Sequence, residues 1–149
     1  MKTPDPLLSP DRVLATDDDL ADLLSRLLGS AHLRQCWLIM LGPDDRSTGP
    51  LMPMSDYPRD PDELARSGDL GTLPVARLLT HRFGQFAELC GATQIVLVWE
   101  RRGSRTFRDE DRRWAGAISR HCRELGVPLR AQFVLHSRGL RVIAPDDQC

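Results

Sequence analysis

The sequence lacks the short patterns that build metal, redox and phosphate sites. Its four cysteines are far apart and form no Cys-x-x-Cys pair, which argues against structural zinc and against a disulfide framework. His81 has no second histidine four residues away, and no glycine-rich motif surrounds Gly103. We therefore expect no metal and no cofactor, and we expect the cysteines to be small buried side chains in a reducing compartment.

Long apolar runs are also missing. The N-terminal stretch Met-Lys-Thr-Pro-Asp-Pro does not have the pattern of a signal peptide, and no segment approaches the roughly 18 apolar residues that span a bilayer. We expect a cytoplasmic protein that does not enter a membrane. A length of 149 residues with 41% hydrophobic side chains suits one compact domain with a single core.

Lysine is nearly absent, because Lys2 is the only one and the other 19 basic residues are arginines. The formal net charge of −1 conceals a split along the chain. Residues 1–74 hold 13 acidic and 7 basic side chains, whereas residues 75–149 hold 8 and 13. Two solvated faces would give this asymmetry, and so would a surface for nucleic acid or an acidic partner.

Apolar periodicity predicts an α/β domain with a mixed sheet flanked by helices. Apolar residues at helical spacing indicate three helices, near residues 17–28, 74–90 and 109–125. We expect Asp17, Asp18 and Asp19 to cap the first helix. Five strands are expected, at residues 36–41, 51–54, 94–100, 129–135 and 139–144.

The stretch Ile95–Val98 is an unbroken apolar run with β-branched residues, which is typical of a strand covered on both faces. We expect residues 94–100 to be the central strand. Pro53 removes a ladder donor from residues 51–54, so that strand is expected at an edge, where an isologous homodimer could form.

Three stretches are expected to carry no regular structure. Residues 1–16 are expected to be a flexible arm before the domain at 17–144, and residues 145–149 a tail. Residues 55–72 are rich in Pro, Asp, Gly and Ser and are expected to be a long exposed loop, either a binding element or merely mobile.

From Leu73 to Ala144 the chain resembles the JAB (MPN/JAMM) fold, and within it the RadC-like branch. The similarity is carried by these stretches: the strand and loop Gln94–Gly103, the helix start Arg108-Asp-Glu-Asp111, the segment Leu125-Gly-Val-Pro-Leu129, and the strand and turn Phe133–Gly139. The resemblance implies a cytidine-deaminase-like three-layer sandwich.

The resemblance also implies a lost zinc site. Active members hold zinc with two histidines and an aspartate, but the histidine positions are Val98 and Glu100 here. Val98 has no lone pair to offer a metal. Glu100 and Asp111 are left as remnants, and the resemblance assigns no catalytic residue.

The loop after the predicted central strand is rich in arginine. Forked donors that suit phosphates or carboxylates come from Arg101, Arg102, Arg105 and Arg108. Trp99 or Phe107 could stack on a base or ring. Alternatively, the arginines form a surface ion-pair set with Glu100, Asp109, Glu110 and Asp111.

Two hypotheses follow. The first is a non-catalytic module that binds a protein partner, a nucleic acid or another anionic ligand through residues 100–113, residues 55–72, or both. The second is a small hydrolase with a relocated site around Asp111 and His136, with Cys149 as a further candidate. We also expect solvated side chains at Arg101 and Arg102, and buried ones at Trp37 and Trp114.

Overall fold

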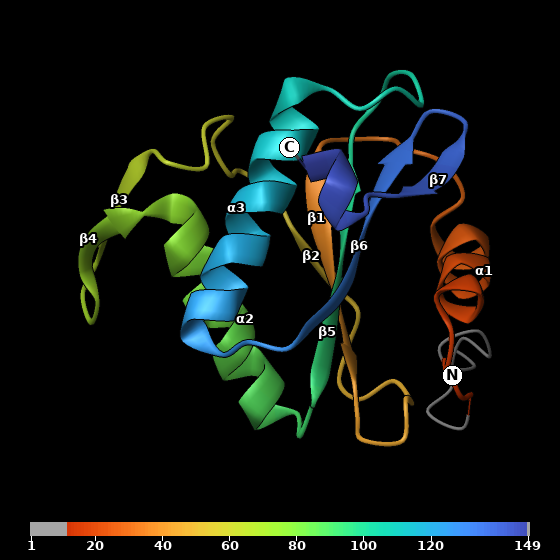
Figure 1. Ribbon diagram of the computed structural model, residues 1–149, viewed down its shortest axis with the longest axis horizontal. Helices are drawn as coiled ribbons and strands as arrows, with labels where there is room; N and C mark the ends of the chain where they lie inside the picture. Colours follow the sequence, from red (N-terminus) through yellow and green to blue (C-terminus); the bar gives the residue numbers. More distant parts are fainter. Residues whose placement is uncertain (1–11, 149) are drawn as a thin grey trace, which may run out of the picture.

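A five-stranded mixed sheet forms the centre of the molecule, with helices on both faces (Figure 1). The computed structural model describes residues 12–148. The sheet strands lie in the order β2-β1-β5-β6-β7, and β3 pairs separately with β4. The elements are α1 (Asp17–Leu28), β1 (Gln35–Leu41), β2 (Met52–Met54), β3 (Leu64–Ser67), β4 (Gly71–Pro74), α2 (Val75–Leu89), β5 (Gln94–Glu100), α3 (Asp109–Leu125), β6 (Leu129–His136), β7 (Gly139–Val142) and a short 3-10 helix (Pro145–Gln148).

The central position predicted for residues 94–100 is confirmed. β5 runs antiparallel to β1 and parallel to β6, and its residues 95–100 are all buried. Its side chains alternate between two core clusters: Val96 and Val98 pack on the α1 side, whereas Leu97 and Trp99 pack on the side of α2 and α3. The sheet is therefore the middle of three layers, as Figure 1 shows.

All three predicted helices are present, with their ends within a residue or so of the expected ones. The cap of α1 differs from the expectation. Thr16 is the cap, because its hydroxyl accepts from the Asp19 N–H at 3.0 Å while the Asp19 carboxylate accepts from the Thr16 N–H at 3.1 Å. The three aspartates instead fill the first turn, where negative charge suits the helix dipole.

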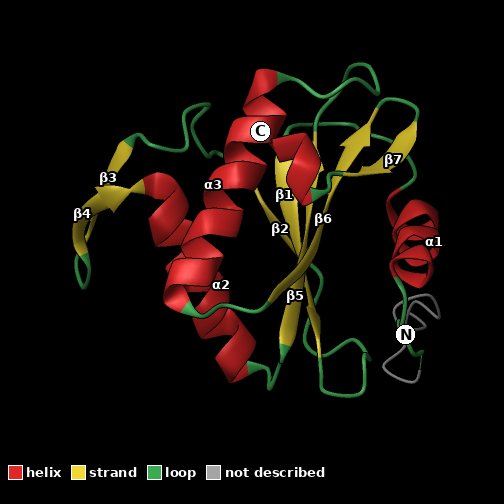
Figure 2. Cartoon of the chain, viewed as in Figure 1, coloured by secondary structure: helices red, strands yellow, loops and turns green. Residues whose placement is uncertain are grey.

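The expectation of one long loop at residues 55–72 was wrong. This segment contains β3 and begins β4, and the two strands form a hairpin that projects beside α2 (Figure 2). Both strands are mostly exposed, so they lack the apolar alternation from which a strand is predicted. Tyr57, before the hairpin, is buried rather than mobile on the surface.

The two ends of the chain also differ from the expectation. Leu14 is 1% exposed and its N–H donates to the Asp45 carbonyl, so residues 12–16 are anchored through Leu14 and are not a loose arm. The rest of the expected arm, residues 1–11, lies outside the described residues. Pro145–Gln148, expected to be an irregular tail, is a 3-10 helix that packs on α3.

Trp114 is 1% exposed, as predicted, but Trp37 is only partly buried. Within residues 12–148, no helix combines the length and apolar character that crossing a bilayer requires.

Candidate functional site

The loop that follows β5 and the turn that follows β6 lie together at one edge of the sheet. Because β5 and β6 are parallel, their carboxyl ends share this edge, which is where open α/β sheets place their ligands. The Gly103 N–H donates to the Ser137 hydroxyl at 2.8 Å, and the Ser137 N–H donates to the Gly103 carbonyl at 3.1 Å. Two hydrogen bonds therefore join the loop 101–108 to the turn 136–139.

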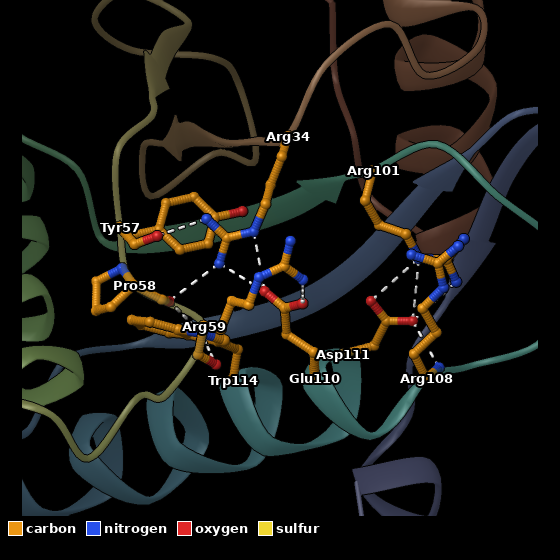
Figure 3. A network of polar contacts seen from close by, with 9 residues as sticks. All are labelled: Arg34, Tyr57, Pro58, Arg59, Arg101, Arg108, Glu110, Asp111 and Trp114. Carbon is orange, nitrogen blue, oxygen red and sulfur yellow. Dashed lines mark hydrogen bonds and ion pairs between the residues drawn. The ribbon is translucent and has the colours of Figure 1, made fainter.

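Arg101 does not point into solvent, contrary to the expectation. It is 7% exposed, and its Nε and Nη2 reach the Asp111 carboxylate at 3.2 and 2.8 Å (Figure 3). The same guanidinium donates to the carbonyls of Ser104 at 2.5 Å and Thr106 at 3.0 Å. Arg101 thus fixes the course of the loop from inside, and it is unavailable to a ligand.

Asp111 has a second task at the start of α3. Its Oδ2 accepts from the Arg108 N–H at 2.8 Å, which satisfies one of the backbone donors left free at a helix start. Both carboxylate oxygens are therefore engaged inside the protein. A metal ion would have to displace a buried guanidinium in order to reach them.

The Glu100 carboxylate turns to the α1 side of the sheet, where Trp37 packs. It accepts from the backbone N–H groups of His32 and Leu33 at 2.7 and 3.0 Å. It also accepts from Gln35 Nε2 at 2.9 Å and Trp37 Nε1 at 2.8 Å. Burial by itself would raise the pKa of this carboxyl, but the four donors outweigh it and hold the pKa below its ordinary value.

Glu100 and Asp111 both line the small cavity beside Trp99, but among the described residues no hydrogen-bond partner is shared between their carboxylates. Glu100 anchors the segment between α1 and β1, and Asp111 holds Arg101. Within residues 12–148, no group of three or more His, Cys, Asp or Glu residues is arranged to hold a metal ion.

Neither aromatic residue proposed for stacking is free to stack. Trp99 is 3% exposed and donates from its indole nitrogen to Gln132 at 2.7 Å. Phe107 is 6% exposed and lies beneath the Arg141 guanidinium, whose Cζ is 3.9 Å from the ring centre. Trp99 instead packs with Tyr57 and Trp114 in a core cluster of three rings.

A second polar network joins the start of α3 to residues 57–59 (Figure 3). Arg34 pairs with Glu110 at 2.6 Å, donates to the carbonyls of Tyr57 and Pro58, and lies 3.9 Å from the centre of the Tyr57 ring. The Trp114 indole also donates to the Pro58 carbonyl, at 3.0 Å. The cavity beside this network holds about 20 Å³, room for little more than one water molecule.

Most of the remaining arginines at this edge have no acidic partner. Within residues 12–148, seven arginine side chains have no carboxylate within 4.0 Å, and five of them belong to residues 101–108 and the β6–β7 hairpin. We call these five the arginine cluster: Arg102, Arg105, Arg108, Arg138 and Arg141. The first four are exposed and Arg141 is half-buried. Of the predicted ion-pair set only Arg101–Asp111 is formed within residues 12–148, and Asp109 pairs instead with Arg112, which was not in the set.

Gly103 lets one of these arginines fold over the loop. Its φ is +122°, and a Cβ placed on it would lie 2.9 Å from Arg108 Cζ and 3.5 Å from Arg101 Nη1. Two guanidiniums thus come close to one point, while Asp111 neutralises only one of them. Excess positive charge of this kind favours a bound anion.

Two members of the arginine cluster, Arg138 and Arg141, were not predicted as site residues. A sequence signal was present, since both lie just beyond the expected strand at residues 129–135, in the turn and strand that follow it. Nothing in the sequence links Arg34 or Tyr57 to this region, because their partners are far along the chain.

The residues of the hydrolase hypothesis are not arranged as a catalytic set. His136 Nδ1 accepts from the Arg138 N–H at 3.2 Å, and Asp111 is occupied by Arg101. Cys149 lies outside the described residues. Of the described cysteines, Cys122 is 2% exposed and burial raises the pKa of its thiol to about 12, which leaves it protonated and unreactive.

No family model matches the chain, and no curated protein matches it in a sequence comparison.

Proposed function

We propose that this protein is a non-catalytic JAB-like module of the RadC-like branch that binds an anionic ligand through the arginine cluster. The observation that carries the proposal is the imbalance at the carboxyl ends of β5 and β6. The carboxylates there are bound by internal partners, whereas the five arginines have no carboxylate partner within the described residues; Arg102 and Arg141 donate only to backbone carbonyls, of His32 and Arg105.

The sheet supports the fold part of the proposal. Strand order β2-β1-β5-β6-β7, with α1 on one face and α2 and α3 on the other, is compatible with the three-layer sandwich that the resemblance implies. The hairpin β3–β4 is an addition between the second strand and the second helix.

The loss of catalysis is supported by the state of the two remnant carboxylates. Arg101 places a guanidinium on Asp111, where a dication would otherwise bind, and Glu100 has no free lone pair for a water or a metal. The hydrolase alternative has little support, since Asp111 and His136 do not share a hydrogen bond and no activated nucleophile lies between them in the described residues.

A binding measurement with a matched control tests the proposal. Fluorescent heparin, titrated at about 20 mM and about 150 mM salt, is expected to bind at low salt and to weaken as salt rises. Arg105→Ala with Arg108→Ala is expected to abolish the binding. The control is Arg66→Ala with Arg123→Ala, which removes the same charge from two arginines that also lack a carboxylate partner but lie on β3 and near the end of α3.

The contrary outcomes are also defined. If heparin does not bind at low salt, or if the control pair loses as much affinity as the test pair, the arginine cluster is only a solvated surface. A protein partner with an acidic face would bind the same residues, and an acidic peptide in place of heparin tests that partner class.

A further inference from the structure

His136 lies beneath the arginine cluster at the end of β6. Phe133 and Leu135 belong to the core on the α1 side and Val134 to the core on the α3 side, so alternation places His136 on the α3 side with Arg101. The imidazole is 5% exposed. The ring therefore lies just below the surface, near Arg101, Arg105 and Arg141.

The hydrogen bond at Nδ1 of His136 determines whether Nε2 is a donor or an acceptor. Because His136 Nδ1 accepts from the Arg138 N–H, the proton of the neutral ring is on Nε2. Nε2 has no hydrogen-bond partner within residues 12–148. Two unpartnered side-chain atoms there are sealed from solvent, on His121 and Arg130, and His136 Nε2 is not one of them. The ring therefore offers one N–H donor to the surface.

The charges around this donor are all of one sign. Burial lowers the pKa of His136, and Arg101, Arg105 and Arg141 lower it further. Arg101 and Arg105 come from the loop 101–108, and Arg141 comes from β7. On α3, Asp111 is already paired with Arg101. Arg105 and Arg141 have no carboxylate partner within the described residues, so a neutral donor beside them is a favourable place for a compact anion.

The geometry favours a terminal phosphate over a nucleic-acid chain. Arg141 donates to the Arg105 carbonyl at 3.2 Å, and Arg108 lies over Gly103, which is hydrogen-bonded to Ser137 next to His136. Guanidinium forks and an N–H donor on two neighbouring segments suit one tetrahedral group with several acceptor oxygens. A single-stranded nucleic acid would need exposed rings on which to stack its bases, but Trp99 and Phe107 are both buried.

We infer that the anion bound by this surface is a phosphomonoester, held by Arg105, Arg108 and Arg141 with the Nε2–H of His136 as the donor at the base of the site. The inference rests on the proposed function, because it names the ligand class of the same surface. It adds a residue, His136, and a link to protonation. A bound dianion favours the charged imidazolium, so binding moves the pKa of His136 upward.

Phenyl phosphate is the probe, with binding measured by calorimetry and the His136 ring followed by NMR. We expect binding at low salt and an upward move of the His136 pKa when the site is filled. His136→Leu is expected to lose roughly tenfold or more in affinity, since a hydrogen bond to a charged group is removed. His136→Gln, which keeps an N–H donor near the same place, is expected to stay within about threefold of the parent protein.

The comparison ligands separate this inference from the proposed function. If heparin and an oligonucleotide without a terminal phosphate bind but phenyl phosphate does not, the inference is overturned and the proposed function stands. If none of the three binds at low salt, both fail. Equal affinity of His136→Leu and the parent, or an unmoved His136 pKa on binding, also overturns the inference.

The source of the phosphate is decided by two further ligands. A phosphoserine peptide and a sugar phosphate present the same group on a macromolecule and on a small molecule. If His136→Leu is too unstable to measure, judged by thermal melting, His136→Gln with Arg141→Ala replaces it. That pair is expected to lose affinity relative to His136→Gln alone, and equal affinity would overturn the assignment of Arg141.

Discussion

Arg101 and Asp111 form the one ion pair within residues 12–148 in which both side chains are less than a tenth exposed, at 9% and 5%. A buried pair is costly to break, since removing one partner leaves the other charged in a poorly solvated place. The pair also joins the end of β5 to the start of α3, so the loop between them is held at both ends.

Arg101→Ala is expected to lower the free energy of unfolding by about 3 kcal/mol or more, which is the usual cost of orphaning one member of a buried pair. Urea unfolding at pH 7 measures it. Arg102→Ala is the neighbouring control, expected to stay within about 0.5 kcal/mol because its side chain is exposed. Equal stability of the Arg101 variant and the parent would mean that the pair does not hold the loop.

Glu100 predicts a pH dependence of stability. Because folding lowers the pKa of this carboxyl below its ordinary 4.5, its contribution is complete above about pH 4.5 and is lost as pH falls through the folded-state pKa. Glu100→Gln is expected to lower the free energy of unfolding by roughly 1–3 kcal/mol at pH 7, because the amide NH2 group of glutamine would face N–H groups that now donate to the carboxylate. The variant should also lose less stability between pH 5 and pH 3 than the parent. Parallel pH curves for the two proteins would refute this role.

Gly103→Ala tests the shape of the loop. The φ of +122° and the crowding of its Cβ by Arg108 predict a loss of roughly 1–3 kcal/mol and weaker binding of anions. Gly68→Ala is the matched control, because a Cβ there meets nothing within 4 Å and the backbone is not in the left-handed region. Thermal melting and the heparin titration measure both variants. If Gly103→Ala changed neither the stability nor the binding, the position of Arg108 over the loop would not matter for either.

Metal content distinguishes the two function classes. Purified protein is expected to carry well under one equivalent of zinc or manganese, because both oxygens of Asp111 are engaged by Arg101 and the Arg108 N–H. Elemental analysis after dialysis gives the answer. Stoichiometric metal would revive the hydrolase and count against the non-catalytic module.

The oligomeric state stays a prediction. β2 is an edge strand with an exposed Pro53, and β7 is the other edge, so an isologous dimer would pair one of these edges with its copy. Sedimentation velocity at micromolar concentration is expected to show the dimer, and Pro53→Lys to dissociate it if β2 is the edge used. A parent protein that sediments only as a monomer ends the idea.

The sheet and its helices could be predicted because their signals are local. β5 is buried on both faces, which gives the unbroken apolar run Ile95–Val98, and α1 is buried on one face, which gives leucines at helical spacing. Both patterns can be recognised in a short stretch of sequence. The hairpin β3–β4 could not be predicted in this way. Its strands bury little, so their pairing leaves almost no trace in the residue pattern.

The position of the arginine cluster was predicted as a region but not in its detail. Arginine-rich residues after a central strand indicate an anion-binding edge, and the edge does carry unpaired arginines. Which arginine would turn inward could not be read from the sequence. Arg101 and Arg102 are adjacent and chemically alike, and only the alternation of β5 carried into the loop directs the first toward Asp111 and leaves the second exposed.

The projecting hairpin gives the protein a natural attachment point. Its turn at Gly68 is exposed and lies far from residues 101–108 (Figure 1). A thiol introduced as Gly68→Cys would sit in open space, so the chain could be tethered there to a sensor chip or a fluorophore with the arginines facing the solution. The position of the tether would then set the orientation of the protein on the chip. Without it, a negatively charged chip would bind the arginines and hide them from the solution.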